Sequence, residues 1–279
     1  MTTEVRSVSL QNLSHVVGIM NESSRGLSIE YGLTVMRFLW LARHWNFSYE
    51  QSLVYYAGER PAALILNCID PAARDAHCFY WGAAREYWNR RVAMRLLEAS
   101  CRKLQEAGYT RFHSASIPDR PPERYRSLRF GIDRNLVEMH ASAMNLAGET
   151  RAFEIRKLGV ESLLSLNAAA GEYVHWRQRP SFLAKAAPFF HVFGAFDQGE
   201  LRAYTVVLPD TAATTLVDLR SAERSAEAGW ALLRLIKEEY PAPHTAEIVA
   251  EDSYMFGLLT AAGFEVRHRF AAMSRDLTV

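Results

Sequence analysis

The sequence predicts two tandem α+β modules, each with a mixed, mostly antiparallel central sheet flanked by helices. The chain has 279 residues, which is enough for two domains of ordinary size. The same order of predicted strands and helices occurs in both halves. Leu96–Leu97 recurs 136 positions later as Leu232–Leu233, and Gly131–Ile132 recurs 132 positions later as Gly263–Phe264. A repeat with so long a period indicates duplicated domains.

The polar segment 143–150, which contains Asn145, Gly148 and Glu149, is the predicted linker. We therefore expect an N-terminal domain over residues 1–143 and a C-terminal domain over residues 151–279.

In the first half, apolar residues at helical spacing predict helices over Asn12–Met20 and Leu33–Trp45. A polar turn at Gly58 lies between the β-prone runs 52–57 and 62–67 and predicts a hairpin, and strands are expected over 77–82 and 110–116. Between these two strands, Val92–Ala107 is the longest predicted helix, with Gly108 as its C-terminal signal. A short helix over Pro121–Leu128 and a strand over 135–142 follow.

The second half repeats this order from residue 191 onward. A hairpin, a further strand, a long helix, a strand, a second helix and a final strand are expected over 191–208, 214–219, 226–239, 246–250, 254–262 and 265–273.

The composition is that of a folded protein whose net charge is too small to create a strong electrostatic field. Hydrophobic residues make up 49% and charged residues 23%, and 32 basic against 31 acidic residues give a net charge of +1. A nucleic acid or an anionic membrane would therefore have to bind a local patch. We expect a soluble, cytoplasmic protein with no membrane partner, because no apolar run is long enough to span a bilayer.

Cysteines and histidines give no metal signature. Cys68, Cys78 and Cys101 lack metal-ligand spacing and are predicted to be buried thiols, and the nine histidines form no known metal motif. No metal is expected.

The start of the predicted helix at Val92 has the features of an anion site. The first amides of a helix have no helical partner and carry the positive end of the dipole. Arg85, Arg90, Arg91 and Arg95 lie close to that start in sequence. A phosphorylated ligand would be favoured there, although a solvated basic helix end is the alternative.

This segment resembles the GNAT N-acetyltransferases, whose fourth strand leads into a Q/R-x-x-G-x-G/A loop followed by Leu-Leu. Residues 88–93 occupy that pattern before Leu96–Leu97, with Ala93 matching, Trp88 in place of Gln or Arg, and Arg91 in place of the first Gly. Residues 224–229 match at Arg224 and Gly229 but have Glu227 at the Gly position. A carboxylate disfavours a phosphate there, so the first half is the preferred donor site.

The resemblance implies an acyl-CoA donor held where two parallel strands separate, with direct attack by an amine and no metal. The donor contacts that it implies are Trp81, Gly82, Ala83, Trp88, Asn89, Arg90, Arg91, Val92 and Ala93. Trp40 and Trp45 fall where early helices of the family cover the acceptor, so they are the candidate substrate contacts.

The family often uses a tyrosine, four residues before a late Gly-Phe, to protonate the leaving thiolate. Counting back from Gly131 gives Ser127, and counting back from Gly263 gives Leu259. Tyr125 would serve only if the register is shifted. Asp218, a carboxylate in an apolar run, is the candidate base.

Three functions follow from these patterns. The favoured one is N-acyl transfer from acyl-CoA to a small-molecule amine. The second keeps the fold but takes an aminoacyl group from charged tRNA, since Arg91 would suit a nucleic-acid backbone. The third is a non-catalytic module that binds a metabolite.

Overall fold

The computed structural model divides the chain into two compact units, Met1–Asp133 with Ala271–Val279, and Arg134–Phe270. It describes residues 3–27, 30–116, 123–146, 152–159, 161–165, 174–185, 187–210, 213–221, 225–240 and 243–278. These limits differ from 1–143 and 151–279, because β12 (Glu265–Asp276) begins in the second unit and ends in the first. The division into two successive GNAT-like domains remains a prediction.

The first unit has a central sheet in the order β1-β2-β3-β4-β5-β12. All its neighbours run antiparallel except β4 and β5, which are parallel. The strands that precede β12 are β1 (Thr3–Ser7), β2 (Phe47–Ala57), β3 (Arg60–Asp70), β4 (Asp75–Ala83) and β5 (Arg111–Ser116). β2 and β3 confirm the hairpin predicted around Gly58.

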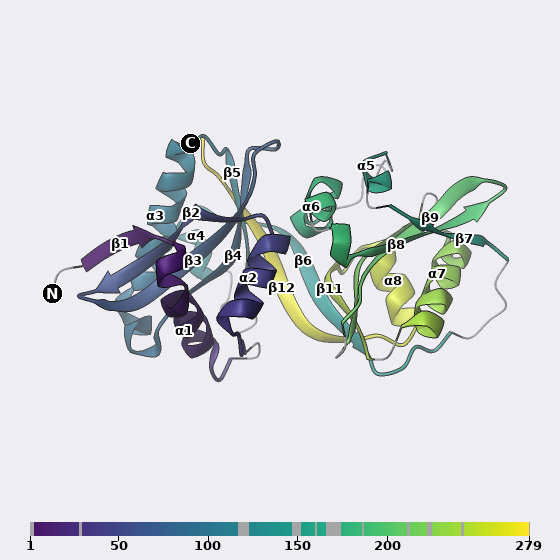
Figure 1. The fold of residues 1–279 in the computed structure, drawn as a ribbon, viewed down its shortest axis with the longest axis horizontal. Coiled ribbons are helices and arrows are strands. Elements are labelled where there is room, and N and C mark those ends of the chain that lie inside the picture. Colours follow the sequence, from purple (N-terminus) through teal and green to yellow (C-terminus); the bar gives the residue numbers. More distant parts are fainter. Residues whose placement is uncertain are drawn as a thin grey trace. The chain divides into compact units, whose positions relative to one another are not determined.

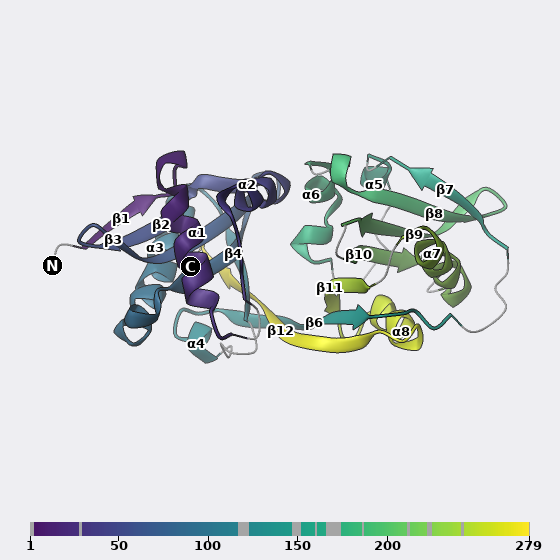
Figure 2. The ribbon, with the colours of Figure 1, turned by 60° about the horizontal axis from the view of Figure 1, so that its bottom comes forward.

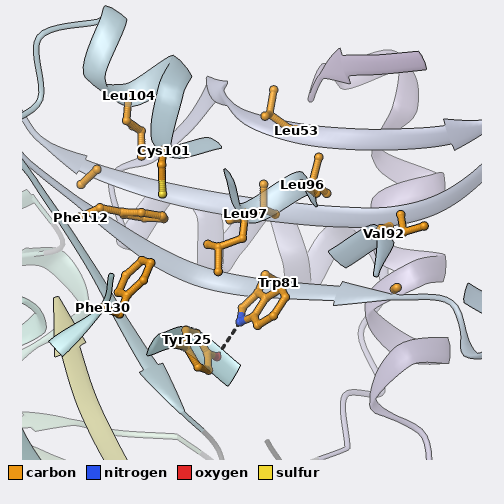
Figure 3. Packing of buried hydrophobic residues seen from close by; sticks show 14 of the residues in the cluster. Leu53, Trp81, Val92, Leu96, Leu97, Cys101, Leu104, Phe112, Tyr125 and Phe130 are labelled. Carbon is orange, nitrogen blue, oxygen red and sulfur yellow. Dashed lines mark hydrogen bonds between the residues drawn. The ribbon is translucent and has the colours of Figure 1, made fainter. Parts of the chain in front are cut away.

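Helices cover both faces of this sheet (Figures 1 and 2). One face packs on α1 (Leu13–Ser24) and α2 (Val35–His44), and the other on α3 (Val92–Glu106) and α4 (Glu123–Arg126). The α3 face carries the larger apolar cluster, in which Leu96, Leu97 and Phe112 are almost fully buried (Figure 3). Below, these are called the α1 face and the α3 face.

The second unit repeats this plan with strand order β6-β11-β10-β9-β8-β7. β10 and β11 are its parallel pair. Its strands are β6 (Gly131–Ala141), β7 (Glu154–Leu158), β8 (His191–Asp197), β9 (Glu200–Leu208), β10 (Thr214–Ser221) and β11 (His244–Ala250), with the start of β12. α7 (Ala226–Glu239) and α8 (Tyr254–Ala261) share one apolar cluster, and α5 (Ser162–Ser165) and α6 (Pro180–Lys185) contribute to another.

The mixed α+β sheets with flanking helices confirm the predicted fold class, and the repeated leucine pair occupies the same place in both units. Leu96–Leu97 on α3 and Leu232–Leu233 on α7 are each 0 to 1% exposed. Some details differ from the sequence prediction. Within the helix expected over Pro121–Leu128, α4 covers Glu123–Arg126 and Ser127 lies in the turn that follows it, while residues 121–122 lie outside the described residues.

The buried-thiol prediction holds for two cysteines. Cys68 and Cys101 are buried, whereas Cys78 is half-buried. Burial raises the pKa of the Cys101 thiol to about 11, which keeps it protonated at neutral pH. Among the described residues, no helix has the length and apolar character of a membrane span.

Candidate functional site

The two parallel strands of the first unit are paired over only part of their length. The ladder joins Asp75–His77 to Arg111–His113, and then β4 continues to Ala83 and β5 to Ser116 without further pairs between them. A bulge at Phe79 accompanies the end of pairing, since Cys78 and Tyr80 face successive residues of β3. We call residues 77–83 and 113–116 the β4–β5 fork.

Tyr125 of α4 brings its hydroxyl group to both strands of the fork. The indole Nε1–H of Trp81 on β4 donates to the Tyr125 oxygen at 2.7 Å (Figure 3). The Tyr125 hydroxyl donates in turn to the backbone carbonyl of Ala115 on β5 at 3.4 Å. Tyr125 is 1% exposed and Trp81 9% exposed, so the hydrogen bonds form within the α3-face core. A phenol is therefore held at the fork.

The register that the sequence predicts for the acid is displaced by two residues. Gly263 is in the left-handed region at φ 85°, and the Phe264 N–H donates to the Leu259 carbonyl at 3.0 Å. In the first unit, it is Arg129 that has a positive φ, 60°, and the Phe130 N–H donates to the Tyr125 carbonyl at 3.3 Å. The structural match to Gly263–Phe264 is therefore residues 129–130.

This alignment changes which residue stands where the family resemblance predicts an acid. Because Arg129 takes the place of the late glycine, four residues earlier is Tyr125 and not Ser127. Ser127 is exposed in the turn after α4, whereas Tyr125 is buried against the fork. The count from Gly131 failed because a non-glycine residue occupies the left-handed position, which a sequence pattern based on glycine does not detect.

The start of α3 lacks the side-chain cap found on several other helices. Its N-cap, Arg91, is left-handed at φ 55° and ψ 17°, and the Arg91 side chain makes no cap hydrogen bond. Left-handed backbone favours glycine, which explains why the family pattern has Gly at this position. Val92 and Ala93 form the first turn, and the exposed side chains of Arg85 and Arg95 carry positive charge nearby. Uncapped amides beside basic side chains suit an anionic group.

The residues between β4 and α3 form a 3₁₀ helix, Arg85–Arg90. Trp88 donates from Nε1 to the Ala83 carbonyl at 2.7 Å and remains 41% exposed, so its ring lies against the end of β4.

A Cβ on Gly82 would lie 2.9 Å from the Ser23 Oγ, so packing against α1 accounts for this glycine. The side chains of Asn89 and Arg90, both predicted donor contacts, lie outside the described residues.

The two predicted acceptor contacts lie at the α2 end of the unit. Trp45 directly follows α2, and its ring centroid lies 6.2 Å from that of Phe79, the bulge residue of β4. Trp40 is on α2 and has the Arg37 guanidinium 4.1 Å from its ring centroid. Both are half-buried. Trp45 therefore lies beside the β4–β5 fork, where its ring faces that of Phe79.

The second unit has a similar fork occupied by a buried ion pair. The β10–β11 ladder ends at Leu216 and Ala246, and the bulge residue is Val217. Asp218 then accepts hydrogen bonds from Arg220 Nε at 2.9 Å and Tyr204 Oη at 3.1 Å. Burial raises the pKa of the Asp218 carboxyl, while Arg220 and Tyr204 act in the opposite direction.

The start of α7 is both capped and packed. Ser225 is the N-cap and accepts from Ala228 N at 3.5 Å, and its carbonyl accepts from the Tyr254 hydroxyl of α8 at 2.7 Å. A Cβ on Gly229 would lie 2.3 Å from Tyr254 Oη and 2.5 Å from Leu258 Cδ2. The glycine that matches the donor-loop pattern is therefore required for close packing of α7 on α8.

Metal ligation finds no support in the part of the chain that the structure describes. There, no three or more His, Cys, Asp or Glu side chains gather closely enough to hold an ion. The candidate site consists of hydrogen-bonding, aromatic and basic groups.

Comparisons with known structures show the fold. A tandem GNAT protein from the clavulanic acid biosynthesis pathway matches with a TM-score of 0.73 and 13% identity over 99% of both chains. A GCN5-related N-acetyltransferase from Sphaerobacter thermophilus matches with a TM-score of 0.74 and 9% identity, over 99% of this chain and 96% of its own.

A third match is Saccharomyces cerevisiae N-myristoyltransferase with bound myristoyl-CoA, with a TM-score of 0.63 and 10% identity, over 99% of this chain and 79% of its own. Neither a protein-family profile nor a curated protein sequence matches the chain. The chain has the tandem GNAT fold.

Proposed function

We propose, from the tandem GNAT fold, that this protein is an N-acyltransferase that moves an acyl group from an acyl-CoA to the amine of a small molecule. The observation that carries the proposal is the uncapped, basic start of α3 next to the β4–β5 fork. The fold is shared with structures whose names include N-acetyltransferase and N-myristoyltransferase. The donor site belongs to the first unit in this proposal.

The chemistry of the α3 start fits the phosphates of coenzyme A. The amides of Val92 and Ala93 would donate to a phosphate oxygen, and the Arg91, Arg85 and Arg95 guanidinium groups would balance its charge. The exposed ring of Trp88 would offer a flat apolar surface beside them. When bound, an acyl-CoA supplies a thioester carbonyl that is activated toward an amine.

Tyr125 is the proposed acid. Its hydroxyl would give a proton to the thiolate that leaves when the C–S bond breaks, and the Trp81 N–H would stabilise the resulting phenolate by the hydrogen bond that it already donates. On the opposite face, Trp45 beside Phe79 would contact the amine acceptor. Ser127, exposed in its turn, has no role in this scheme.

The second unit supports the assignment by contrast. Tyr254 and Leu258 pack against the start of α7, and Glu227 adds negative charge to its first turn. Asp218 is held in its buried pair with Arg220, so we assign it a structural role instead of that of the base. We propose one donor per chain.

To test the proposal, the protein is incubated with acetyl-CoA and primary amines. The release of free coenzyme A thiol is measured, and mass spectrometry identifies the acylated amine. Tyr125→Phe should lower turnover by about 10²-fold or more, in the range of general acid catalysis, with acetyl-CoA affinity unchanged. Activity that requires charged tRNA and disappears with ribonuclease would instead identify an aminoacyl donor. Binding of acetyl-CoA without transfer to any amine would favour a non-catalytic module.

A further inference from the structure

Three titratable side chains meet near the end of the β4–β5 ladder, where His77 and His113 form the last rung and Asp75 comes from the first. The rings of His77 and His113 are stacked, with centroids 4.8 Å apart and planes 22° apart. Asp75 Oδ2 lies 3.3 Å from His113 Nε2, in ion-pair range. The side chain of His113 is 17% exposed and that of Asp75 11%, whereas His77 is fully buried. Only His113 and Asp75 in this set reach solvent.

This group lies on the α1 face, opposite Tyr125. Side chains alternate along a strand, and Ala76 and Phe112, the neighbours of His77 and His113, belong to the α3-face core. Tyr125 also belongs to that core. The histidine pair and the tyrosine hydroxyl therefore approach the fork from its two faces, where the parallel strands stop pairing.

The arrangement suits the acceptance of one proton. Asp75 Oδ2 lies within ion-pair distance of His113 Nε2, although the two atoms form no hydrogen bond, so a carboxylate would stand beside an imidazolium and Nδ1 is the ring nitrogen left to accept a proton.

Other charged or titratable groups occupy the surrounding strands. By register, Cys68 lies beside His77, Asp70 and Arg111 lie beside Asp75, and Asp276 lies beside Arg111. Next to His113, Ser274 bonds to Asp133 at 2.8 Å. Arg111 and the carboxylates of Asp70, Asp75 and Asp276 thus follow one another across β3, β4, β5 and β12.

We propose that His113 is the proton acceptor for the incoming amine, with Asp75 and His77 as positioning residues. This inference rests on the proposed acyl transfer. An ammonium group loses one proton to His113 Nδ1, and the free amine then forms the C–N bond at the thioester carbonyl. When the C–S bond breaks, Tyr125 protonates the thiolate, and the second proton lost by nitrogen restores the Tyr125 hydroxyl. One proton is released overall, from His113 to water.

Nuclear magnetic resonance of the full chain tests whether the pair lies at the reacting end of the donor. Acetyl-CoA should shift the ring signals of His77 and His113 and the amide signals of Val92 and Ala93, with His15 on α1 as the unshifted control. Adenosine 3′,5′-bisphosphate, which lacks the thioester arm, should shift the amides alone.

Shifted amides with unshifted histidine signals under acetyl-CoA would overturn the inference while the proposed donor site stands. If neither set shifts, the proposed donor site fails and the inference fails with it.

A pair of small amines then tests the proton transfer itself. Ethylamine is an ammonium ion at neutral pH, whereas hydroxylamine is mostly the free base and needs no deprotonation before attack. His113→Asn should lower ethylamine acylation by about 10²-fold and hydroxylamine acylation much less, since general base catalysis contributes about 10²–10⁴-fold. Asp75→Asn should give the same selectivity with a smaller loss. Equal losses for both amines would assign the pair a purely structural role and overturn the proposal.

Discussion

The two units have the same fold but different helix starts at the equivalent position. Leu96 is the fifth residue of α3, whereas Leu232 is the seventh residue of α7, so α7 begins two residues earlier relative to the shared leucine pair. Its first turn is capped by Ser225 and packed by Tyr254, whereas Arg91, the N-cap of α3, makes no side-chain cap hydrogen bond. One fold thus has a left-handed N-cap without a cap hydrogen bond in one unit and a serine-capped helix start in the other.

The two units also differ where their parallel strands stop pairing, at the β4–β5 fork and at the end of the β10–β11 ladder. Beyond its bulge, β4 presents Tyr80 and Trp81, and Trp81 is bonded to Tyr125. Beyond its bulge, β10 presents Asp218 and Arg220, which are bonded to each other and buried. The residue that matches Tyr125 in the second unit is Leu259, which has no proton to give. The comparison teaches that the second unit keeps the packing of the first but has leucine where the first has Tyr125.

Breaking the buried pair of the second unit should have the largest effect on stability. Arg220→Met leaves Asp218 buried without its cation, so we expect a loss of about 3–5 kcal/mol in the free energy of unfolding, measured by urea denaturation. Asp218→Asn combined with Arg220→Met should recover most of the loss, because the uncompensated charge is removed. A loss below about 1 kcal/mol for Arg220→Met would mean that the pair contributes little.

Filling the close contact between α7 and α8 should have the next largest effect. Gly229→Ala places a Cβ 2.3 Å from Tyr254 Oη, so we expect a loss of about 1–3 kcal/mol from overpacking. Gly257→Ala on α8 is the matched control, since no atom lies within 4 Å of its Cβ, and it should gain up to about 1 kcal/mol from helix propensity. Equal effects of the two substitutions in thermal denaturation would refute the close packing.

In the first unit, the Trp81–Tyr125 hydrogen bond should contribute a smaller coupling. Tyr125→Phe leaves the buried indole N–H of Trp81 without this acceptor, at a cost of about 1–2 kcal/mol. A double-mutant cycle with Trp81→Phe should give a coupling of about 1 kcal/mol. Additive losses would show that the two side chains do not depend on each other.

The pH dependence of the second unit should be the smallest effect. Burial lowers the pKa of His191 and of His244, so both resist protonation in the folded state more than in the unfolded state. Their contribution to the free energy of unfolding is fully present above about 6.5, the pKa of histidine in the unfolded chain. It is lost as the pH falls from that value toward the lower pKa of the folded state. His191→Gln should flatten the fall in stability seen by urea denaturation below that pH. An unchanged profile would contradict this.

The sequence predicted elements whose signals are local. The Gly58 turn and its flanking β-prone runs define β2 and β3, and the apolar face ending at Gly108 defines α3, where Gly108 has φ 85°. The element order and the leucine pairs predicted the duplication. The strand β7 and the helices α5 and α6 were missed, because residues 151–190 show no strong periodicity.

The site was predicted only in part, because its geometry depends on contacts between distant segments. The predicted donor loop at Arg91 follows from a motif, but the left-handed backbone of Arg91 does not. Tyr125 was displaced from the acid position by two residues, since Arg129 occupies the place of a glycine. The stacking of His77 on His113 arises from parallel pairing of β4 with β5, which no local pattern encodes.

Isothermal titration with acetyl-CoA tests the central claim most directly. It counts the binding sites per chain, and it compares the affinities of variants whose charge is reversed at or away from the α3 start. The unchanged protein should bind one acetyl-CoA per chain. Arg91→Glu should weaken binding at least about tenfold by placing a carboxylate at the α3 start, whereas Arg102→Glu, with the same change of net charge farther along α3, should not. Two sites per chain, or equal affinity for both variants, would contradict a single donor cradle at the first unit's helix.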